Sequence, residues 1–297
     1  EFDAEGGSLD FEIQTNVDVT VSIPDSCSSW IRQVETRGLE TKKLLFEISA
    51  CDTLNIDRCG QILLQGGSVT QTIKITQTII SELLAAEMEA LIAFYKATDG
   101  DNWTVNTNWC SEKPVEEWYG ITTKGESYGM TSSRVDNMVC EIRLSINNLS
   151  GILPAEIGVF SELEILSLYD NKISGEIPAE ISNLKKLREI LLNNNDISGN
   201  IPSQIGVLNN LRFLGLSGNN FEGIIPDSIV KLNELEYLSL GWNNLSGKIP
   251  DSIGNLTKLI SFSLDGNNIV GKIPESLMNI KTLEDLGLSD NSLSGGI

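Results

Sequence analysis

The chain has 297 residues, of which 40% are hydrophobic and 21% charged, a composition typical of a globular protein with more than one domain. Its formal net charge of −20 at pH 7 argues against nucleic acid and anionic lipid as partners, because both carry negative charge. No segment approaches about 18 consecutive apolar residues, so no membrane-spanning segment is expected. The chain begins at Glu1 without a signal peptide, and we expect a processed or trimmed form.

Residues 1–80 show the alternation of apolar and polar side chains that is typical of β-strands. The first alternating run ends at Pro24 and contains Phe11, Ile13, Val17, Val19, Val21 and Ile23. Further short apolar runs follow, separated by turn residues. This pattern predicts an immunoglobulin-like β-sandwich over residues 1–80.

Three motifs stand out in this segment, namely Ser29-Trp30-Ile31, Arg58-x-Gly60-x-Ile62 and Ile73-x-Ile75-x-Gln77. Their order resembles a BACON domain, a module of surface and secreted proteins of Bacteroidetes. The resemblance implies either carbohydrate binding or a spacer role. We find no candidate here for an exposed aromatic platform, and we expect Trp30 to be a core residue.

Residues 81–140 are expected to form a separate cap segment. Ser81 is a candidate N-cap for a helix that ends at Asp99-Gly100. The expected apolar face of this helix has spacings of three and four: Leu84, Met88, Leu91, Ile92 and Tyr95. Asp99 and Asp101 lack the further carboxylates of a calcium loop, which favours a solvated turn over a metal site.

The five cysteines are Cys27, Cys51, Cys59, Cys110 and Cys140. The chain has no CxxC pair and no histidine, which argues against a zinc site. An odd count leaves at least one thiol unpaired within the chain. A disulfide between Cys110 and Cys140 is one possibility, and five small buried thiols are the other.

From Ile142 onward the sequence repeats itself every 24 residues. The repeated asparagines are Asn147, Asn171, Asn195, Asn219, Asn243, Asn267 and Asn291. A glycine follows each asparagine by four residues, and a proline comes three residues later in all but the last repeat. Such a period predicts a solenoid, in which each unit buries its apolar residues against its neighbours.

The repeat reads xxLxxLxxLxLxxNxLSGxIPxxI and resembles a leucine-rich repeat, with an LSGxIP segment like that of the plant-type subclass. The resemblance implies a right-handed superhelix with a parallel sheet on its concave face over residues 141–297. Trp103, Trp109 and Trp118 with the preceding helix resemble the N-terminal cap of this subclass. The asparagine side chains, which both donate and accept, are expected to stack as a ladder that satisfies backbone groups at the strand ends.

The array stops at Gly295-Gly296-Ile297, with no polar capping segment after it. An uncapped solenoid end exposes apolar surface. We therefore expect either an open end, with a parent protein that continues, or a shortened sample.

Residues six, four, two and one before each repeated asparagine are expected to point outward from the concave sheet. Large side chains cluster there in the middle repeats. The predicted partner-binding residues are Ile165, Tyr169, Asp170, Leu191, Asn193, Phe213, Tyr237 and Trp242. Phe213 and Tyr237 are neighbours in one column, which favours either a contact surface or simple packing of one ring on the next.

Signatures of catalysis are missing from the sequence. Without histidine there is no Ser-His or Cys-His pair, and GxSxG, GxxxxGK[ST] and GxGxxG motifs are absent. Acidic residues that could serve glycoside hydrolysis lie at variable repeat positions, which favours a role in solubility. We therefore predict no enzymatic activity, no cofactor and no metal.

The sequence thus predicts a monomeric recognition or adhesion protein that is secreted or displayed on the cell surface. Its expected partner is a protein or peptide on the concave face of the repeats. A lipid anchor on a removed N-terminal segment stays open. The alternatives are a glycan-binding protein that acts through the β-sandwich and a structural spacer without a ligand.

Overall fold

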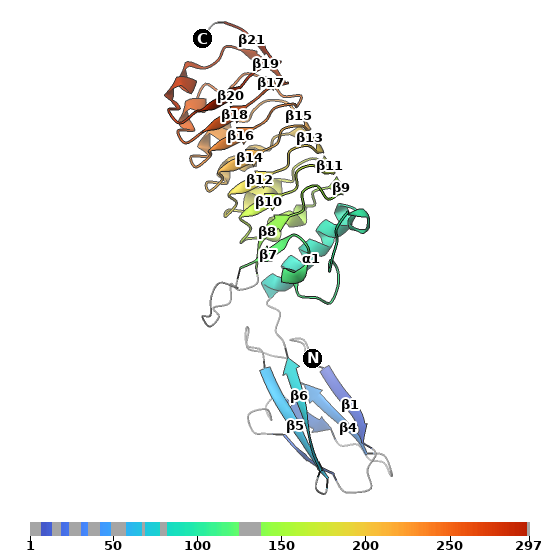
Figure 1. Cartoon of the computed structure of the whole chain (residues 1–297). Coiled ribbons are helices and arrows are strands. Elements are labelled where there is room, and N and C mark those ends of the chain that lie inside the picture. The colour runs from blue at the N-terminus through green and yellow to red at the C-terminus, as the bar shows by residue number, and fades with distance from the viewer. Residues whose placement is uncertain are drawn as a thin grey trace. The chain divides into compact units, whose positions relative to one another are not determined.

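The computed structural model describes residues 7–13, 19–23, 31–34, 42–48, 58–66, 69–77, 82–124 and 138–295. The chain divides into two compact units, residues 1–85 and 86–297, which are described separately (Figure 1).

The first unit contains six described strands, β1 (Gly7–Ile13), β2 (Val19–Ser22), β3 (Ile31–Val34), β4 (Lys42–Ile48), β5 (Arg58–Gly66) and β6 (Val69–Gln77). They form two antiparallel sheets, with strand orders β1-β4-β3 and β2-β5-β6. The alternating run that begins at Phe11 therefore supplies two strands of different sheets. Trp30, Cys27 and Cys51 lie outside the described residues, and the sandwich packing and the BACON resemblance stay predictions.

The predicted cap helix, α1 (Glu82–Ala97), begins just before residue 86 and lies mostly in the second unit. Its most deeply buried residues are Glu87, Ala90, Leu91 and Phe94. The buried face of α1 therefore differs by about one residue from the predicted apolar face. Of the residues predicted for that face, Leu84, Met88, Ile92 and Tyr95 are only partly buried. The buried face could not be predicted from apolar residues alone, because it includes a glutamate.

The tryptophans of the cap are buried, as predicted, and join the core of the repeats. Trp109 contacts Trp103 and Trp118, with ring centroids 4.8 and 5.2 Å apart. Each indole N–H donates to a backbone carbonyl, so none is buried without a partner. Short elements complete the cap, namely η1 (Gly100–Asn102), η2 (Val115–Glu117) and β7 (Ile121–Thr123). The aromatic cluster therefore covers the N-terminal end of the repeat core.

The repeats form a long sheet of eight strands, in the order β7-β8-β10-β12-β14-β16-β18-β20 (Figure 1). Strand β7 is antiparallel to β8, and all other pairs are parallel. The remaining bounds are β8 (Val139–Arg143), β10 (Ile165–Ser167), β12 (Glu189–Leu191), β14 (Phe213–Gly215), β16 (Tyr237–Ser239), β18 (Ser261–Ser263) and β20 (Asp285–Gly287). Residues 24 apart are paired in every parallel ladder of this long sheet, as between Ile165 and Glu189. The predicted parallel sheet is confirmed.

The LSGxI segments form a second row of strands that the sequence reasoning did not predict. The strands are β9 (Ser150–Ile152), β11 (Lys172–Gly175), β13 (Asp196–Asn200), β15 (Asn220–Glu222), β17 (Ser246–Gly247), β19 (Asn268–Gly271) and β21 (Ser292–Leu293). Serine hydroxyls support the row, since Ser174 Oγ donates to the carbonyl of Gly151 at 2.9 Å. The repeated glycines have φ between 74° and 103°, the left-handed conformation that glycine tolerates best.

A short 3₁₀ helix then returns the chain to the long sheet. These helices are η3 (Ala155–Val159), η4 (Ala179–Asn183), η5 (Ser203–Val207), η6 (Asp227–Lys231), η7 (Ile253–Asn255) and η8 (Glu275–Asn279). A proline directly precedes five of them, where its fixed φ and missing N–H suit the start of a helix.

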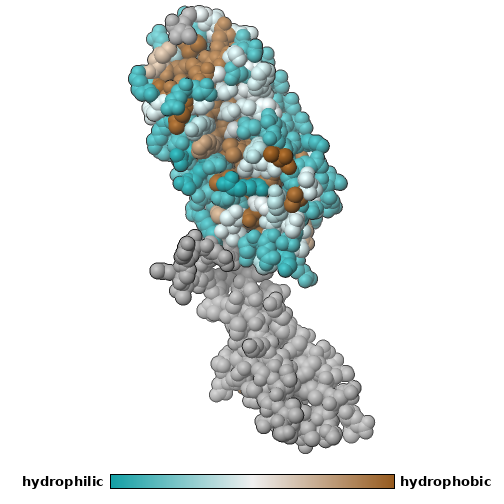
Figure 2. Space-filling model, viewed as in Figure 1, coloured by the Kyte–Doolittle hydropathy of each residue, from teal (hydrophilic) through white to brown (hydrophobic). Residues whose placement is uncertain are grey.

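The last repeat exposes residues whose counterparts are buried. Leu286 of β20 is exposed, whereas Leu238 and Phe262 at the same repeat position are buried. Figure 2 shows hydrophobic residues gathered at the C-terminal end of the array and scattered elsewhere on the visible face. The apolar interior is thus uncovered where the described repeats end.

The seven asparagines are stacked one per repeat at the ends of the long strands. Asn195 Nδ2 donates to the carbonyls of Leu168 and Leu192 at 3.0 and 3.1 Å, and its Oδ1 accepts from Ile173 N at 3.0 Å. Asn219, Asn243, Asn267 and Asn291 repeat this set. Asn147 at the start exchanges hydrogen bonds with Val105 of the cap instead. Each asparagine therefore links neighbouring turns of the solenoid.

Replacing Asn219 with alanine is expected to reduce the free energy of unfolding by about 1–3 kcal/mol per buried backbone group that loses its partner. Asn219 Nδ2 serves the carbonyls of Leu192 and Leu216, and its Oδ1 serves Ile197 N. Asn220→Ala is the matched control, because Asn220 is the next residue and is exposed. Urea denaturation of both variants checks the expectation, which fails if both lose the same stability.

Candidate functional site

The candidate site is the outer face of the long sheet. We define the outer sheet face as the residues six, four, two and one before each ladder asparagine, from Glu141 to Asp290. Residues five and three before each asparagine point inward, as with the buried Leu166 and Leu168. This alternation follows from strand geometry and leaves the columns in between available to a partner.

Phe213 and Tyr237 form a stacked pair on this face. They are register partners on β14 and β16, and their rings are 4.6 Å apart with planes 6° from parallel. Tyr237 is still 37% exposed. The two interpretations of the sequence are therefore compatible, because the rings pack on one another and one of them also faces solvent.

Trp242 is the most exposed aromatic side chain that we find on the outer sheet face, at 62%. Its φ of 53° places it in the left-handed region, which bulky residues occupy at a cost. Other repeats fill the same position with Asp170, Asn194, Gly218, Gly266 and Asp290, residues that tolerate this conformation better. The indole lies over Gly266, where an added Cβ would come within 2.6 Å of Trp242 Cε3.

Ile146 shares this unusual position in the first repeat. It is 66% exposed and has a φ of 56°. Sequence reasoning placed Ile146 in the right column but did not single it out, since the left-handed conformation of the column is visible only in the structure.

The other predicted partner-binding residues lie on the same face but are less available. Ile165, Tyr169, Leu191 and Asn193 are half-buried. Asn193 Oδ1 accepts from the backbone N–H of Ser217 at 3.0 Å, so this amide also has a structural role. Asp170 is exposed, and it accepts from Asn194 Nδ2 at 2.7 Å.

The outer sheet face is strongly acidic. Its carboxylates are Glu141, Asp170, Glu189, Asp265, Asp285 and Asp290, against the single cation Arg143. One positive and six negative charges give this face a net charge of −5. Arg143 Nε pairs with Glu141 at 2.8 Å, and the other five carboxylates form no ion pair with any described residue. Sequence reasoning set out these columns but overlooked their charge.

Asp265 is held in its ionised form. Burial opposes ionisation, but hydrogen bonds from the hydroxyl and backbone N–H of Ser289 and from Ser263 Oγ outweigh it and lower the pKa of Asp265. A carboxylate bound in this way keeps its charge and its orientation over the physiological pH range.

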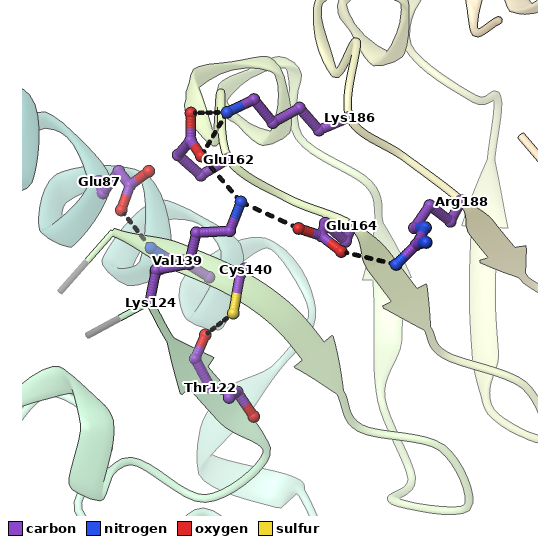
Figure 3. Close-up of polar contacts among 9 residues, drawn as sticks. All are labelled: Glu87, Thr122, Lys124, Val139, Cys140, Glu162, Glu164, Lys186 and Arg188. Carbon is purple, nitrogen blue, oxygen red and sulfur yellow. Dashed lines mark hydrogen bonds and ion pairs between the residues drawn. The ribbon is translucent and has the colours of Figure 1, made fainter. Parts of the chain in front are cut away.

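A neighbouring strip of charges behaves differently, because its charges are paired between repeats. The pairs are Glu162 with Lys186, Glu164 with Arg188, Arg212 with Glu236 and Glu234 with Lys258. Lys124 of the cap segment joins the strip and lies 2.9 Å from both Glu162 and Glu164 (Figure 3). These exposed pairs balance charge along the array and leave no unpaired group for a ligand.

Glu87 of α1 lies next to this strip and is buried (Figure 3). Its Oε2 accepts from Val139 N at 2.8 Å, while Oε1 has no hydrogen-bond partner among the described residues. Burial raises the pKa of Glu87 from 4.5 to about 7, with Glu162 adding repulsion and the Val139 N–H opposing the shift. We find no reacting partner beside it, so its described contacts support a role in cap packing.

Cys110 and Cys140 are both free thiols in this structure. Of the two possibilities that the sequence left open for this pair, the structure has the unpaired one. Cys110 is exposed in the cap, whereas Cys140 in β8 donates from Sγ to the carbonyl of Thr122 at 3.4 Å. Burial raises the pKa of both thiols, which favours the unreactive protonated form.

Metal ligands do not cluster in the described part of the chain, where no group of three or more acidic or cysteine side chains could hold an ion. Asp99 and Asp101 are engaged locally, by Asn102 Nδ2 and by the Tyr95 hydroxyl respectively. Among the described helices, none has the length and apolar character needed to cross a bilayer.

Glu87→Gln is expected to flatten the pH dependence of stability. The folded-state pKa of about 7 exceeds the ordinary value of 4.5, so the folded protein binds more protons than the unfolded chain between these values. The free energy of unfolding should therefore fall as pH rises from 4.5 to about 7 and level off above it. The variant should lack this decline, because the amide does not titrate and still accepts from Val139.

Denaturation across that pH range checks the expectation, with Glu89→Gln on the exposed side of α1 as control. A parallel decline in the wild type and in the Glu87 variant would show that other groups cause it.

The Leucine Rich Repeat family matches residues 162–184, 186–208, 210–232, 234–256 and 258–280. No curated protein sequence matches the chain. Among solved structures, PEPR1–AtPEP1 is 30% identical with a TM-score of 0.61, covering 71% of this chain and 29% of that one. The ectodomain of the Arabidopsis receptor kinase HAESA, in complex with an N-terminally extended IDA peptide hormone, is 39% identical with a TM-score of 0.51.

The HAESA similarity covers 52% of this chain and 26% of that one. This chain therefore spans less than a third of the length of either receptor structure. A plant ice-binding protein has the same fold, with 26% identity, a TM-score of 0.60 and coverage of 70% and 72%. Period, sheet register and the matched family agree, and the repeats of this chain are leucine-rich repeats that form a solenoid with an N-terminal helical cap.

Proposed function

We propose that this protein is a non-enzymatic recognition protein that binds a protein or peptide on the outer sheet face. The observation that carries the proposal is Trp242, a large apolar side chain that is exposed although its left-handed backbone conformation is unfavourable. Asparagine, aspartate or glycine occupies this position in most other repeats at lower cost. A costly residue that stays largely exposed is best explained by a contact with a partner.

The neighbouring rings enlarge this contact surface. Tyr237 belongs to the same repeat as Trp242, and Phe213 supports it from the adjacent strand. Gly241 and Gly266 place little bulk around the tyrosine and the indole. Rigid aromatic residues that stand on a sheet lose little conformational freedom on binding, which makes them effective anchors.

Two further points support the proposal. The HAESA ectodomain, to which these repeats are similar, is seen with a peptide hormone ligand. Similarity to a receptor ectodomain also supports an extracellular or cell-surface location for this chain, as the sequence predicts.

Selection from a random peptide display library on the full chain tests the proposal. Tyr237→Ser and Trp242→Asn are the variants of choice, because Ser261 and Asn194 occupy the same columns in other repeats and the scaffold accepts them. We expect both variants to lose at least about tenfold in affinity for selected peptides, since each removes an aromatic anchor. The melting temperature should change little.

Ile224→Asn is the matched control. Ile224 is an equally exposed apolar residue beside the second row of strands, and Asn200 occupies its position in the preceding repeat. Peptides that bind all four proteins equally, or a failure to select any peptide, would contradict the assignment of the outer sheet face as the binding surface.

A further inference from the structure

We propose that the partner presents an extended, positively charged segment that crosses the solenoid from β12 to β20. This inference rests on the proposed function and adds the chemistry and the direction of the partner. Three observations carry it: the unpaired carboxylates of the outer sheet face, their spacing around the aromatic pair, and the open side of the Tyr237 ring.

The first observation is the contrast between two neighbouring sets of charges. In the strip from Glu162 to Lys258, acidic residues have a cation one repeat away. On the outer sheet face, five carboxylates form no ion pair with a described residue, although Arg143, which is paired with Glu141, also attracts Glu189 at longer range. A cationic partner would supply the opposite charge that these carboxylates lack.

The second observation is the order of residues along one column. Glu189, Phe213, Tyr237, Ser261 and Asp285 are register neighbours on β12, β14, β16, β18 and β20. Four strand spacings of about 4.8 Å separate Glu189 from Asp285, which gives about 19 Å. An extended peptide advances about 3.3 Å per residue, so about six steps cover this distance. A segment of about seven residues therefore places a cation at each end, and both cations point to the same side because side chains alternate along the chain.

The third observation concerns the middle of that span. Phe213 covers one face of the Tyr237 ring, and the register neighbour on the other side is Ser261, whose short side chain leaves the second face open. A guanidinium or an apolar side chain can lie there against the ring. Ser261 Oγ donates to Asp285 Oδ2 at 3.1 Å and so orients the carboxylate beside this position.

Some of these acids are also oriented before any partner arrives. Asp265 is fixed by Ser263 and Ser289, and Asp170 by Asn194. Fixed charges lose less entropy on binding than mobile ones, and they discriminate by position as well as by sign. The outer sheet face therefore favours a segment with a defined spacing of cations over a flexible polycation.

Binding of short synthetic peptides to the full chain tests the inference. The probe is acetyl-Arg-Ala-Ala-Ala-Leu-Ala-Arg-amide, in which both arginines and the leucine lie on one face of the extended chain. It is compared with a citrulline version that keeps the shape without the charge and with a rearranged version in which both arginines are adjacent. We expect the citrulline version to bind at least about tenfold more weakly, because two charge pairs are lost. The rearranged peptide should bind several-fold more weakly, and raised ionic strength should weaken the arginine probe most.

Glu189→Gln and Asp285→Asn should each weaken the arginine probe and reduce its salt dependence. Glu222→Gln is the matched control, since Glu222 is an exposed acid of β15 on the second row of strands. Equal loss in Glu222→Gln, or equally tight binding of the citrulline peptide, would overturn the inference. So would displacement of the probe by spermine at equal concentration, since it would show a charged surface without selectivity for a peptide.

The two proposals fail separately. If the display selection yields neutral or acidic peptides that still depend on Tyr237 and Trp242, the outer sheet face binds peptides and only the cationic partner is wrong. If selected peptides ignore the aromatic residues, the proposed function is wrong as well.

Discussion

The structure depends on one hydrogen-bonding constraint, which is that the backbone must turn sharply once per repeat inside a dry interior. The strand ends leave carbonyl and N–H groups that water cannot reach, and each would cost free energy if left alone. One asparagine per repeat satisfies them, by donating to carbonyls of its own and the preceding repeat and accepting from an N–H of the preceding repeat. The strands, the second row and the outer sheet face are held in register by this bond set.

Much of the fold could be predicted from the 24-residue period, because the period alone fixes which residues are neighbours in space. Elements that depend on a single contact could not be predicted. The buried face of α1 contains Glu87, and a reading based on apolar spacing cannot foresee a charged group that Val139 accommodates. The second row of strands was missed because Ser-Gly segments carry little β-propensity and pair only through the stacking of repeats.

The candidate site also has features that the sequence predicts and features that it does not. Its residues could be placed in columns from the sequence, and the stacked pair of Phe213 and Tyr237 followed from their register. The left-handed position of Ile146 and Trp242 could not be read, because tertiary stacking imposes that conformation on residues that rarely adopt it. The excess of acids on the outer sheet face could have been counted from the columns, whereas the ion pairs of the neighbouring strip needed coordinates.

The side chain of each ladder asparagine from Asn171 to Asn291 forms hydrogen bonds only within its own repeat and to the preceding one, and the backbone N–H of Asn195 donates to the next repeat. These contacts are therefore the same at any distance from the cap. A duplicated or deleted unit of 24 residues would preserve every bond type while moving the aromatic pair by one strand spacing, about 4.8 Å. Reach toward a partner and integrity of the core can thus change independently. The number of repeats therefore sets the distance between two contact points, and evolution or design can change it without altering the core.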